Sequence, residues 1–264
     1  MPTISLAQKK NSTRVIFLDI DGTLICKQQP TLTDRTLSVL KKAQQEGHKV
    51  FLNTGRAMAV IPKEMLAAFS FDGIIAGCGS YIRIGDKVLL RQRLRMEFCS
   101  YLAELALTME SKPYCLFGGE EYPLYMNYER EGLEVTSPRD FWEKYDGIAV
   151  TKASMGVRGE EPMPDFGKYR DEITIYRYPH FMEMVPRGYT KATGITFVMK
   201  ALHLPEENSI AIGDSYNDSD MLRAAGVGIA MGAACPEVQA AADFVTLSCE
   251  EDVVAVALEK YLGL

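Results

Sequence analysis

Residues 14–24 have the sequence RVIFLDIDGTL, in which a run of four apolar residues leads directly into two aspartates one residue apart. Short apolar runs rich in β-branched and aromatic residues are typical of strands buried on both faces, as in a parallel sheet. Because residues i and i+2 of an extended segment point to the same side, Asp19 and Asp21 can face one ligand, and Gly22 allows a sharp turn after them. Ligands of open parallel sheets bind beyond the carboxyl ends of the strands, so we expect the chemistry of the protein at this point.

The flanking segments and the end of the chain alternate between strand patterns and helix patterns. Thr33 is expected to cap the first helix, and Gly47 to end it. This alternation predicts a doubly wound parallel sheet. The expected elements are helices at residues 33–46, 57–69, 191–202, 217–225 and 250–261, strands at 50–52, 72–76, 210–213 and 227–230, and a last strand into which residues 240–245 lead.

Residues 83–186 interrupt this rhythm with an α+β pattern. A hairpin is expected at residues 81–90, whereas residues 127–168, rich in Glu, Pro and Gly, show no clear element. We therefore expect an α/β protein with a Rossmann-like doubly wound parallel sheet as its core, formed by residues 1–82 plus 187–264, and an inserted α+β cap domain formed by residues 83–186. Further expected elements of the cap are a helix at 96–109 and strands at 114–117, 122–126, 173–176 and 181–185.

The composition argues against several classes of protein. The chain has 264 residues, 47% of them hydrophobic, and a formal net charge of −6, which argues against global disorder and against nucleic-acid binding through a basic surface. No apolar run approaches the ~20 residues that span a membrane, and residues 1–12 are expected to form a loose polar tail without a signal peptide. The six cysteines match no zinc spacing and are expected to be free thiols. We therefore expect a cytoplasmic protein, a monomer or weak homodimer, with no membrane and no nucleic-acid partner.

Short polar motifs follow the expected strands or begin the expected helices. In a parallel sheet the ends of neighbouring strands converge, so the aspartates of these motifs would gather at one spot. Two unit charges about 4 Å apart repel by roughly 4 kcal/mol at an effective dielectric constant near 20, so such a cluster needs a cation. Carboxylate oxygens with open positions for water and phosphate suit Mg²⁺. The motifs are DIDGT at residues 19–23, NTGR at 53–56, KATG at 191–194 and GDSYND at 213–218, and their aspartates are Asp19, Asp21, Asp214 and Asp218.

Two further motif residues point to an anionic ligand. Lys191 is expected at a helix N-terminus, where the helix dipole disfavours a cation, and a lysine placed there indicates that an anion binds nearby. Thr54, with neighbouring backbone N–H groups, could hold phosphate oxygens. Arg56 is expected at the surface or at the edge of the phosphate site.

In this order, the four motifs resemble those of the haloacid dehalogenase-like (HAD) superfamily of phosphohydrolases. The position and size of the inserted block are similar to those of the Cof-like branch with a type IIB cap, and the resemblance covers essentially the whole chain. It implies that Asp19 is the nucleophile that forms an aspartyl-phosphate. It also implies that Asp21 is the general acid for the leaving alcohol and then the general base for the hydrolytic water.

The same resemblance implies a metal site and a phosphate site. Mg²⁺ would be bound by the carboxylates of Asp19 and Asp214 and by the backbone carbonyl of Asp21. Asp218 would belong to the metal shell or would orient Lys191. The residues implied in holding the transferring phosphoryl group and the substrate are Thr54, Gly55, Lys191 and Asn217.

The chain departs from the family pattern at two places near the site. Relatives often carry Asn-Gly-Ala where residues 78–80 of this chain are CGS, so the Asn contact to the substrate is replaced by Cys78. Relatives often carry Met-Gly-Asn where residues 231–233 are MGA, so Ala233 stands in place of Asn. The cap matches no known substrate signature, although the cap is where substrate choice is expected to lie.

We therefore expect a Mg²⁺-dependent phosphatase that hydrolyses small phosphate monoesters, either sugar phosphates or a phosphorylated cofactor such as pyridoxal phosphate. A phosphotransferase or phosphomutase would use the same Asp19 nucleophile. A non-catalytic phosphate-binding regulatory protein would tolerate loss of a catalytic residue, and none is missing here. A calcium loop is disfavoured because its twelfth position, which should be Glu, is Pro30.

Overall fold

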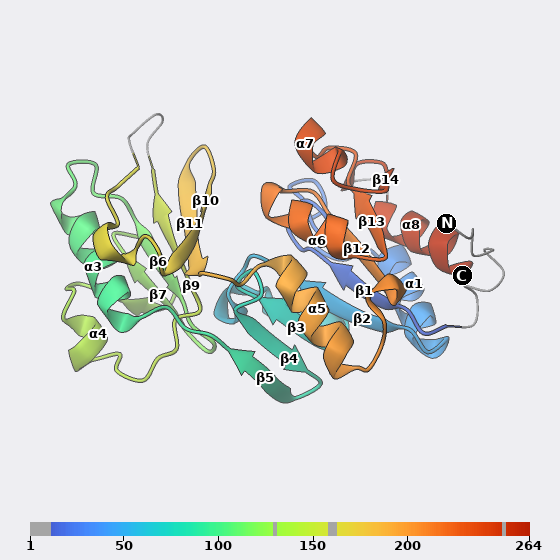
Figure 1. Ribbon diagram of the computed structural model, residues 1–264, viewed down its shortest axis with the longest axis horizontal. Coiled ribbons are helices and arrows are strands. Elements are labelled where there is room, and N and C mark those ends of the chain that lie inside the picture. The colour runs from blue at the N-terminus through green and yellow to red at the C-terminus, as the bar shows by residue number, and fades with distance from the viewer. Residues whose placement is uncertain (1–11, 129–130, 158–162, 250–251) are drawn as a thin grey trace.

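The computed structural model describes residues 12–128, 131–157, 163–249 and 252–264, which form two sheets with flanking helices (Figure 1). The tail expected at residues 1–12 lies outside the described residues except for its last residue, as do the first two residues of the helix expected at 250–261. Within the described part of the chain, no helix has the length and apolar character that crossing a bilayer requires.

The larger sheet confirms the expected doubly wound architecture. Its strand order is β14-β13-β12-β1-β2-β3-β4-β5, and the six strands from β14 to β3 are parallel. β1 lies in the middle, where Leu18 pairs with Ile212 on one side and Leu52 on the other. The strands are β1 (Val15–Leu18), β2 (Lys49–Asn53), β3 (Gly73–Ala76), β4 (Tyr81–Ile84), β5 (Lys87–Arg91), β12 (Ser209–Gly213), β13 (Val227–Ala230) and β14 (Phe244–Val245).

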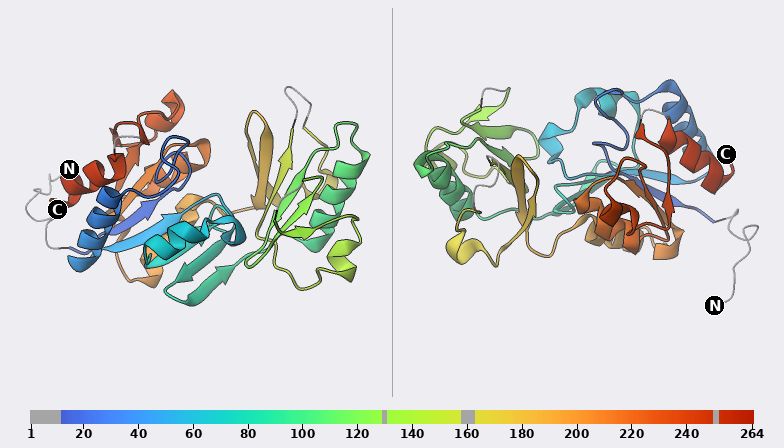
Figure 2. Two further views of the ribbon diagram at one scale, coloured as in Figure 1. Left: turned by 180° about the vertical axis from the view of Figure 1, so that it is seen from behind. Right: turned by 90° about the horizontal axis from the view of Figure 1, so that it is seen from above.

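Alternating side chains of the central strand β1 pack into two separate hydrophobic cores. Ile16 and Leu18 pack into the core shared with α1, α2 and α8, whereas Val15 and Phe17 pack into the core shared with α5, α6 and α7. Seen from above, α1 and α8 lie on one side of the sheet and α5 and α6 on the other (Figure 2). The helices are α1 (Asp34–Gln45), α2 (Lys63–Ala68), α5 (Lys191–Ala201), α6 (Ser219–Ala224), α7 (Pro236–Gln239) and α8 (Val253–Leu262), with a 3₁₀ turn η4 (Glu206–Asn208) before β12.

Most expected helices are present, but two are shorter than expected. Thr33 caps α1 by accepting a hydrogen bond from the backbone N–H of Thr36, as expected. The helix expected at 57–69 is divided into a 3₁₀ turn, η2 (Met58–Val60), and α2, because Pro62 cannot continue a helix. The helix expected at 217–225 likewise begins as a 3₁₀ turn, η5 (Tyr216–Asp218), before α6.

The hairpin β4–β5 extends the larger sheet rather than the smaller one. β4 runs antiparallel to β3, and β5 antiparallel to β4. The boundary expected at residue 83 therefore falls inside β4, and the hairpin is paired with the core sheet. The hairpin joins the core sheet because all four residues of β3 pair with residues of β4.

The smaller sheet forms the cap, and both of its described α-helices lie on the same face. Its order is β10-β11-β9-β6-β7-β8, and α3 and α4 lie on the face that points away from the larger sheet (Figure 1). Phe98 of α3 and Phe141 of α4 pack there against residues such as Phe117. The elements are α3 (Met96–Thr108), β6 (Cys115–Gly118), β7 (Pro123–Met126), β8 (Leu133–Glu134), α4 (Asp140–Glu143), β9 (Lys152–Gly156), η3 (Gly167–Tyr169), β10 (Ile173–Arg177) and β11 (Phe181–Pro186).

Candidate active site

Asp19 follows β1 directly and is held at the centre of the sheet edge. Its backbone N–H donates to the carbonyl of Ile212 in β12 at 3.0 Å, which continues the parallel pairing one residue beyond the strand. The residue is 4% exposed. Burial raises the pKa of Asp19 well above its usual value, Lys191 opposes the shift, and Asp218 reinforces it.

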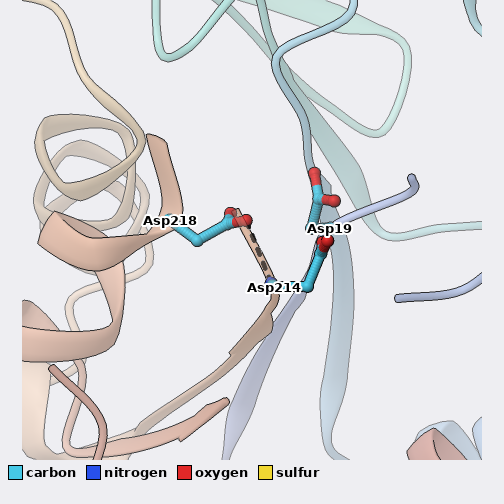
Figure 3. A group of neighbouring side chains, drawn as sticks. All are labelled: Asp19, Asp214 and Asp218. Atoms are coloured by element: carbon cyan, nitrogen blue, oxygen red, sulfur yellow. Dashed lines mark hydrogen bonds between the residues drawn. The ribbon is translucent and has the colours of Figure 1, made fainter. Parts of the chain in front are cut away.

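Three of the four aspartates expected to gather do so. Asp19, Asp214 and Asp218 each offer a carboxylate oxygen within 4.8 Å of the others (Figure 3). Asp214 follows β12, and Asp218 ends the turn η5. The fourth aspartate, Asp21, is not part of this buried group, as its carboxylate turns to the rim of the site.

Lys191 supplies the buried positive charge of the site. It is the first residue of α5 and is 1% exposed. Its Nζ donates to Oδ1 of Asp19 at 2.6 Å and to Oδ1 of Asp218 at 2.5 Å. Burial alone would lower the pKa of Lys191, but the two carboxylates outweigh burial and raise that pKa well above its usual value. The lysine therefore stays charged between two acids.

Asp218 is surrounded by protein donors. Its Oδ1 is bound by Lys191, and its Oδ2 accepts from the backbone N–H of Asp214 at 3.1 Å and from the N–H and hydroxyl of Ser215 at 2.9 Å each. A carboxylate with this many partners holds the loop and the lysine in place. The carboxylates better placed to offer oxygens to a cation are those of Asp19 and Asp214.

Asp214 sits in a tight space that depends on a glycine. Burial raises the pKa of its carboxyl to about 7, with Asp218 adding to the effect. The Thr23 hydroxyl donates to its Oδ1 at 3.3 Å. Gly22 has φ +83°, and a Cβ added there would lie 2.2 Å from Oδ2 of Asp214. Asp19 and Asp214 are close carboxyl groups whose pKa values are both raised, and they fit a hard divalent cation, which would relieve their repulsion.

Asp21 and Arg56 form an ion pair at the exposed rim. Arg56 donates from Nε to Oδ2 of Asp21 at 2.7 Å and from Nη2 to Oδ1 at 2.6 Å, and its Nη1 donates to the carbonyl of Val60 at 2.9 Å. The side chain of Asp21 is 57% exposed. Arg56 therefore lies at the rim of the site, as expected, and is the bidentate partner of Asp21 there.

The other expected phosphate-binding residues, Thr54, Gly55 and Asn217, lie next to one another. The backbone N–H of Thr54, just after β2, donates to the carbonyl of Ile75 at 2.9 Å, and its hydroxyl accepts from the N–H of Arg56 at 3.1 Å. A Cβ added to Gly55 would lie 2.9 Å from Nδ2 of Asn217, so the glycine keeps space beside that amide. These groups come from loops that follow β2 and β12, as expected.

Cys78 occupies the position at which relatives often carry Asn. Nδ2 of Asn217 lies 3.8 Å from its sulfur. Burial raises the pKa of the Cys78 thiol to about 12, so the group is a neutral thiol and not a nucleophile. Cys78 thus offers no amide in place of the Asn of relatives, whereas Asn217 offers an amide group at this side of the site.

Two charged residues of the cap were not expected in the site. Lys152 of β9 donates from Nζ to the carbonyl of Gly55 at 2.5 Å and forms an ion pair with Glu183 of β11. Lys152 falls within the segment for which no element was expected. Glu183 did carry a signal, since it is a charged residue inside the apolar run FMEMV at residues 181–185.

The known proteins to which this chain is similar include phosphatases. A model of the haloacid dehalogenase-like hydrolase family matches residues 16–258. The chain is 26% identical over 270 residues to the 5-amino-6-(5-phospho-D-ribitylamino)uracil phosphatase YitU of Bacillus subtilis, covering 95% of this chain and 98% of that protein. It is 26% identical over 295 residues to the phosphatase YwpJ of Bacillus subtilis, covering 94% of this chain and all of that protein. The structure of the HAD subclass IIB sugar phosphatase BT4131 superposes with a TM-score of 0.82 at 28% identity, covering 95% of this chain and 99% of the other.

Proposed function

Since the chain belongs to the haloacid dehalogenase-like hydrolase family, in its Cof-like branch with a type IIB cap, we propose that this phosphatase hydrolyses small phosphate monoesters with Mg²⁺ through a phosphoryl group carried by Asp19. The observation that carries the proposal is the cluster of four residues in which Lys191 bridges Asp19 and Asp218 next to Asp214. The cluster places the Asp19 carboxylate beside a fixed positive charge, which stabilises the negative charge of an attacked phosphate.

The divalent cation would be held by the carboxylates of Asp19 and Asp214 and by the backbone carbonyl of Asp21. When bound, Mg²⁺ would neutralise charge on the phosphate and orient it. Asp218 contributes indirectly, since its oxygens hold Lys191 and the loop that carries Asp214. We therefore assign Asp218 the role of positioning Lys191 and Asp214 within the metal site.

In the first step Asp19 attacks phosphorus through the carboxylate oxygen that Lys191 does not hold. An O–P bond to Asp19 forms as the P–O bond to the alcohol breaks, and Asp21 donates a proton to the departing oxygen. Lys191, Thr54 and Asn217 hold the phosphoryl oxygens during the transfer. The product of this step is an aspartyl-phosphate and a free alcohol.

In the second step Asp21, now ionised, takes a proton from water, and the water oxygen attacks phosphorus. The O–P bond to Asp19 breaks, which releases inorganic phosphate and regenerates the carboxylate. Arg56, which lines the cavity between core and cap, holds both oxygens of the Asp21 carboxylate at the rim. The side chain of Asp21 is 57% exposed, so water can reach it, and Arg56 has to release one of its oxygens before that oxygen carries a proton.

The smaller sheet is proposed as the cap that selects the alcohol. The backbone N–H of Ala59 donates to the carbonyl of Gly119 at 3.2 Å, and the hydroxyl of Ser80 donates to the carbonyl of Thr151 at 2.9 Å, so the cap contacts the core next to the site. Sugar phosphates or a phosphorylated cofactor are the proposed substrates, and the similarity to the sugar phosphatase BT4131 and to the 5-amino-6-(5-phospho-D-ribitylamino)uracil phosphatase YitU supports small phosphate monoesters. All six cysteines are free thiols, which supports a cytoplasmic location, and we propose a monomer or weak homodimer.

The proposal is tested by phosphate release from a panel of phosphate monoesters, with and without Mg²⁺, by the wild type and Asp19→Asn. We expect release that needs Mg²⁺ and falls by at least about 10³-fold in Asp19→Asn. Asp86→Asn, in the exposed β4–β5 turn, is the matched control and should be as active as the wild type. Equal release by Asp19→Asn, or no release from any ester, would contradict the proposal. Activation by a bisphosphate with little phosphate release would instead indicate a phosphomutase.

A further inference from the structure

A cavity of about 310 Å³ lies between the cap sheet and the core next to Arg56. Alternate residues of the cap strands face it, while the residues between them pack on α3 and α4. The cavity therefore lies on the face of the cap sheet opposite α3 and α4, and its volume fits a small ligand. Its walls from the cap are formed by Tyr114, Leu116, Gly118, Tyr125, Tyr128, Lys152, Ser154, Phe181 and Glu183, and from the core by Arg56, Ala57 and Val60.

Glu183 lines the cavity and carries a buried oxygen without a hydrogen-bond donor among the described residues. The residue is 9% exposed, and its Oε1 accepts from Lys152. Leaving the buried Oε2 without a donor costs free energy, so a bound molecule that donates to it when the side chain turns toward the cavity would recover that free energy.

This oxygen lies close to the phosphate site. A Cβ added to Gly55 would lie 2.9 Å from Nδ2 of Asn217, 3.5 Å from the sulfur of Cys78 and 3.6 Å from Oε2 of Glu183. The three side chains thus lie together beside Gly55. A substrate whose phosphate lies beside Asn217 can therefore place its alcohol part next to Glu183.

The charges around the cavity are already balanced. Lys152 is paired with Glu183, and Arg56 is paired with Asp21 through two hydrogen bonds. A second phosphate or a carboxylate on the alcohol part would have to displace one of these acids. The cavity therefore favours an uncharged alcohol part.

The remaining wall is aromatic. The rings of Tyr114 and Tyr128 lie 5.1 Å apart, and those of Tyr125 and Tyr128 lie 5.9 Å apart. On the other side, the ring of Phe181 stacks on Tyr178 at 4.6 Å with an interplanar angle of 18°. Aromatic walls of this kind bind flat rings through stacking and edge contacts.

We propose that this cavity selects a phosphate monoester whose alcohol part is an uncharged flat ring with an N–H or O–H group that donates to Oε2 of Glu183. The proposal rests on the proposed phosphatase function and narrows its substrate class to esters of hydroxymethyl-substituted aromatic rings or heterocycles. Glu183 is a specificity-determining residue in this account, and the tyrosine wall holds the ring.

The test for Glu183 uses three benzyl-type esters: benzyl phosphate, 3-aminobenzyl phosphate as a donor, and 3-pyridylmethyl phosphate as an acceptor. The 3-amino isomer is used because 2- and 4-aminobenzyl phosphates expel phosphate without an enzyme. In the wild type 3-aminobenzyl phosphate should have a kcat/KM about tenfold above that of benzyl phosphate, and 3-pyridylmethyl phosphate should fall below it. In Glu183→Gln the amide oxygen will turn to Lys152, so the NH₂ group will face the cavity. The order of donor and acceptor esters should then reverse.

Reversal is a result that general structural damage would not produce. Glu143→Gln, on exposed α4, is the matched control and should keep the order of the wild type. The same order in Glu183→Gln as in the wild type, or equal rates for donor and acceptor esters in the wild type, would overturn the proposal.

The tyrosine wall is tested by Tyr128→Leu, with Tyr122→Leu as the control at an exposed tyrosine outside the cavity. Tyr128→Leu should raise KM for benzyl phosphate about fivefold and leave KM for glycerol phosphate unchanged, because a short polyol does not stack. An equal rise for both esters would contradict the ring preference. If benzyl phosphate is hydrolysed without these preferences, the inference fails and the phosphatase function stands; if no ester is hydrolysed, the function itself fails.

Discussion

The substitution Lys191→Met tests the buried charge arrangement most strongly. In the wild type the ammonium lies 2.6 Å from Asp19 and 2.5 Å from Asp218, with the lysine 1% exposed. Methionine fills much of the same space but leaves two buried carboxylates without their common partner. Removing one partner of a buried ion pair costs about 3–5 kcal/mol. For a chain of this size, that loss lowers Tm by roughly 10 °C.

The pH dependence distinguishes lost charge from lost packing. Without Lys191, Asp19 loses the group that lowers its pKa, so its pKa will rise further and the carboxyl will take up a proton more readily. The loss in free energy of unfolding should therefore be largest at about pH 8 and smaller at about pH 5, where protonation removes the unpaired charge. A packing defect would give the same loss at both values.

The assay is urea unfolding of the wild type and the variants at both pH values, without and with Mg²⁺, together with kcat/KM on one phosphate ester. Lys191→Met should lower kcat/KM by about 10²–10³-fold, since it removes a fixed charge beside the phosphate. Adding Asp218→Asn should restore about 1–3 kcal/mol of the lost stability, since one unpaired charge is removed. Lys200→Met, an exposed lysine in the last turn of the same helix, should lose less than about 1 kcal/mol. A Lys191→Met enzyme with wild-type stability at about pH 8, or within about threefold of wild-type activity, would refute this reasoning.

Three further predictions concern the cation and the cap. The Mg²⁺ affinity of the wild type, measured by calorimetry, should rise up to about tenfold per pH unit and level off above about pH 7, because burial raises the pKa of Asp214 to about 7 and its proton has to leave. A Mg²⁺ affinity that stays constant between about pH 5 and pH 7 would disprove this assignment of Asp214. Because folding raises the pKa of Asp214, this carboxyl should stabilise the metal-free protein most below about pH 4, and that contribution should be lost as the pH rises through about 7. Gly22→Ala should abolish the Mg²⁺-induced rise in Tm, since its Cβ would lie 2.2 Å from Oδ2 of Asp214, and a normal rise would contradict this. Gly118→Ala, whose Cβ would lie 2.2 Å from that of Ala57, should push the cap away from the core and lower kcat/KM by up to about 10²-fold. An unchanged kcat/KM would contradict a role for the cap position in catalysis.

The strands of the core could be predicted because each one is a short buried apolar run. β1, β2, β3, β12 and β13 have this pattern, and their ends place Asp19, Thr54 and Asp214 along one edge of the sheet. The order of the motifs along the chain then determines which groups meet. The family and the doubly wound fold predicted in this way are confirmed.

Pairings between distant segments were harder to predict. The hairpin β4–β5 has the same sequence pattern whether it joins the cap or the core, and only its antiparallel contact with β3 decides the matter. Likewise, the contact of Arg56 with Asp21 depends on side-chain conformation rather than on spacing. The break in the second helix could have been expected from Pro62, since proline disfavours helix in the residue before it.

The ion pair of Lys152 with Glu183 shows why the cap was the least predictable part. The two residues are far apart in the sequence and meet because β9 and β11 are neighbours in the sheet. No local pattern encodes that neighbourhood, and the order of the cap strands was not predictable. A charged residue within an apolar strand, as in Glu183, is the signal that remains.

The central claim is that Asp19 carries the phosphoryl group, and the most direct measurement is an acid quench of the enzyme during turnover of a radiolabelled phosphate ester. Mass spectrometry of the peptides then locates the label. The account predicts a transient label on Asp19 that disappears when unlabelled substrate is added, and no label in Asp19→Asn. Turnover without any labelled peptide, or a label on another residue, would contradict it.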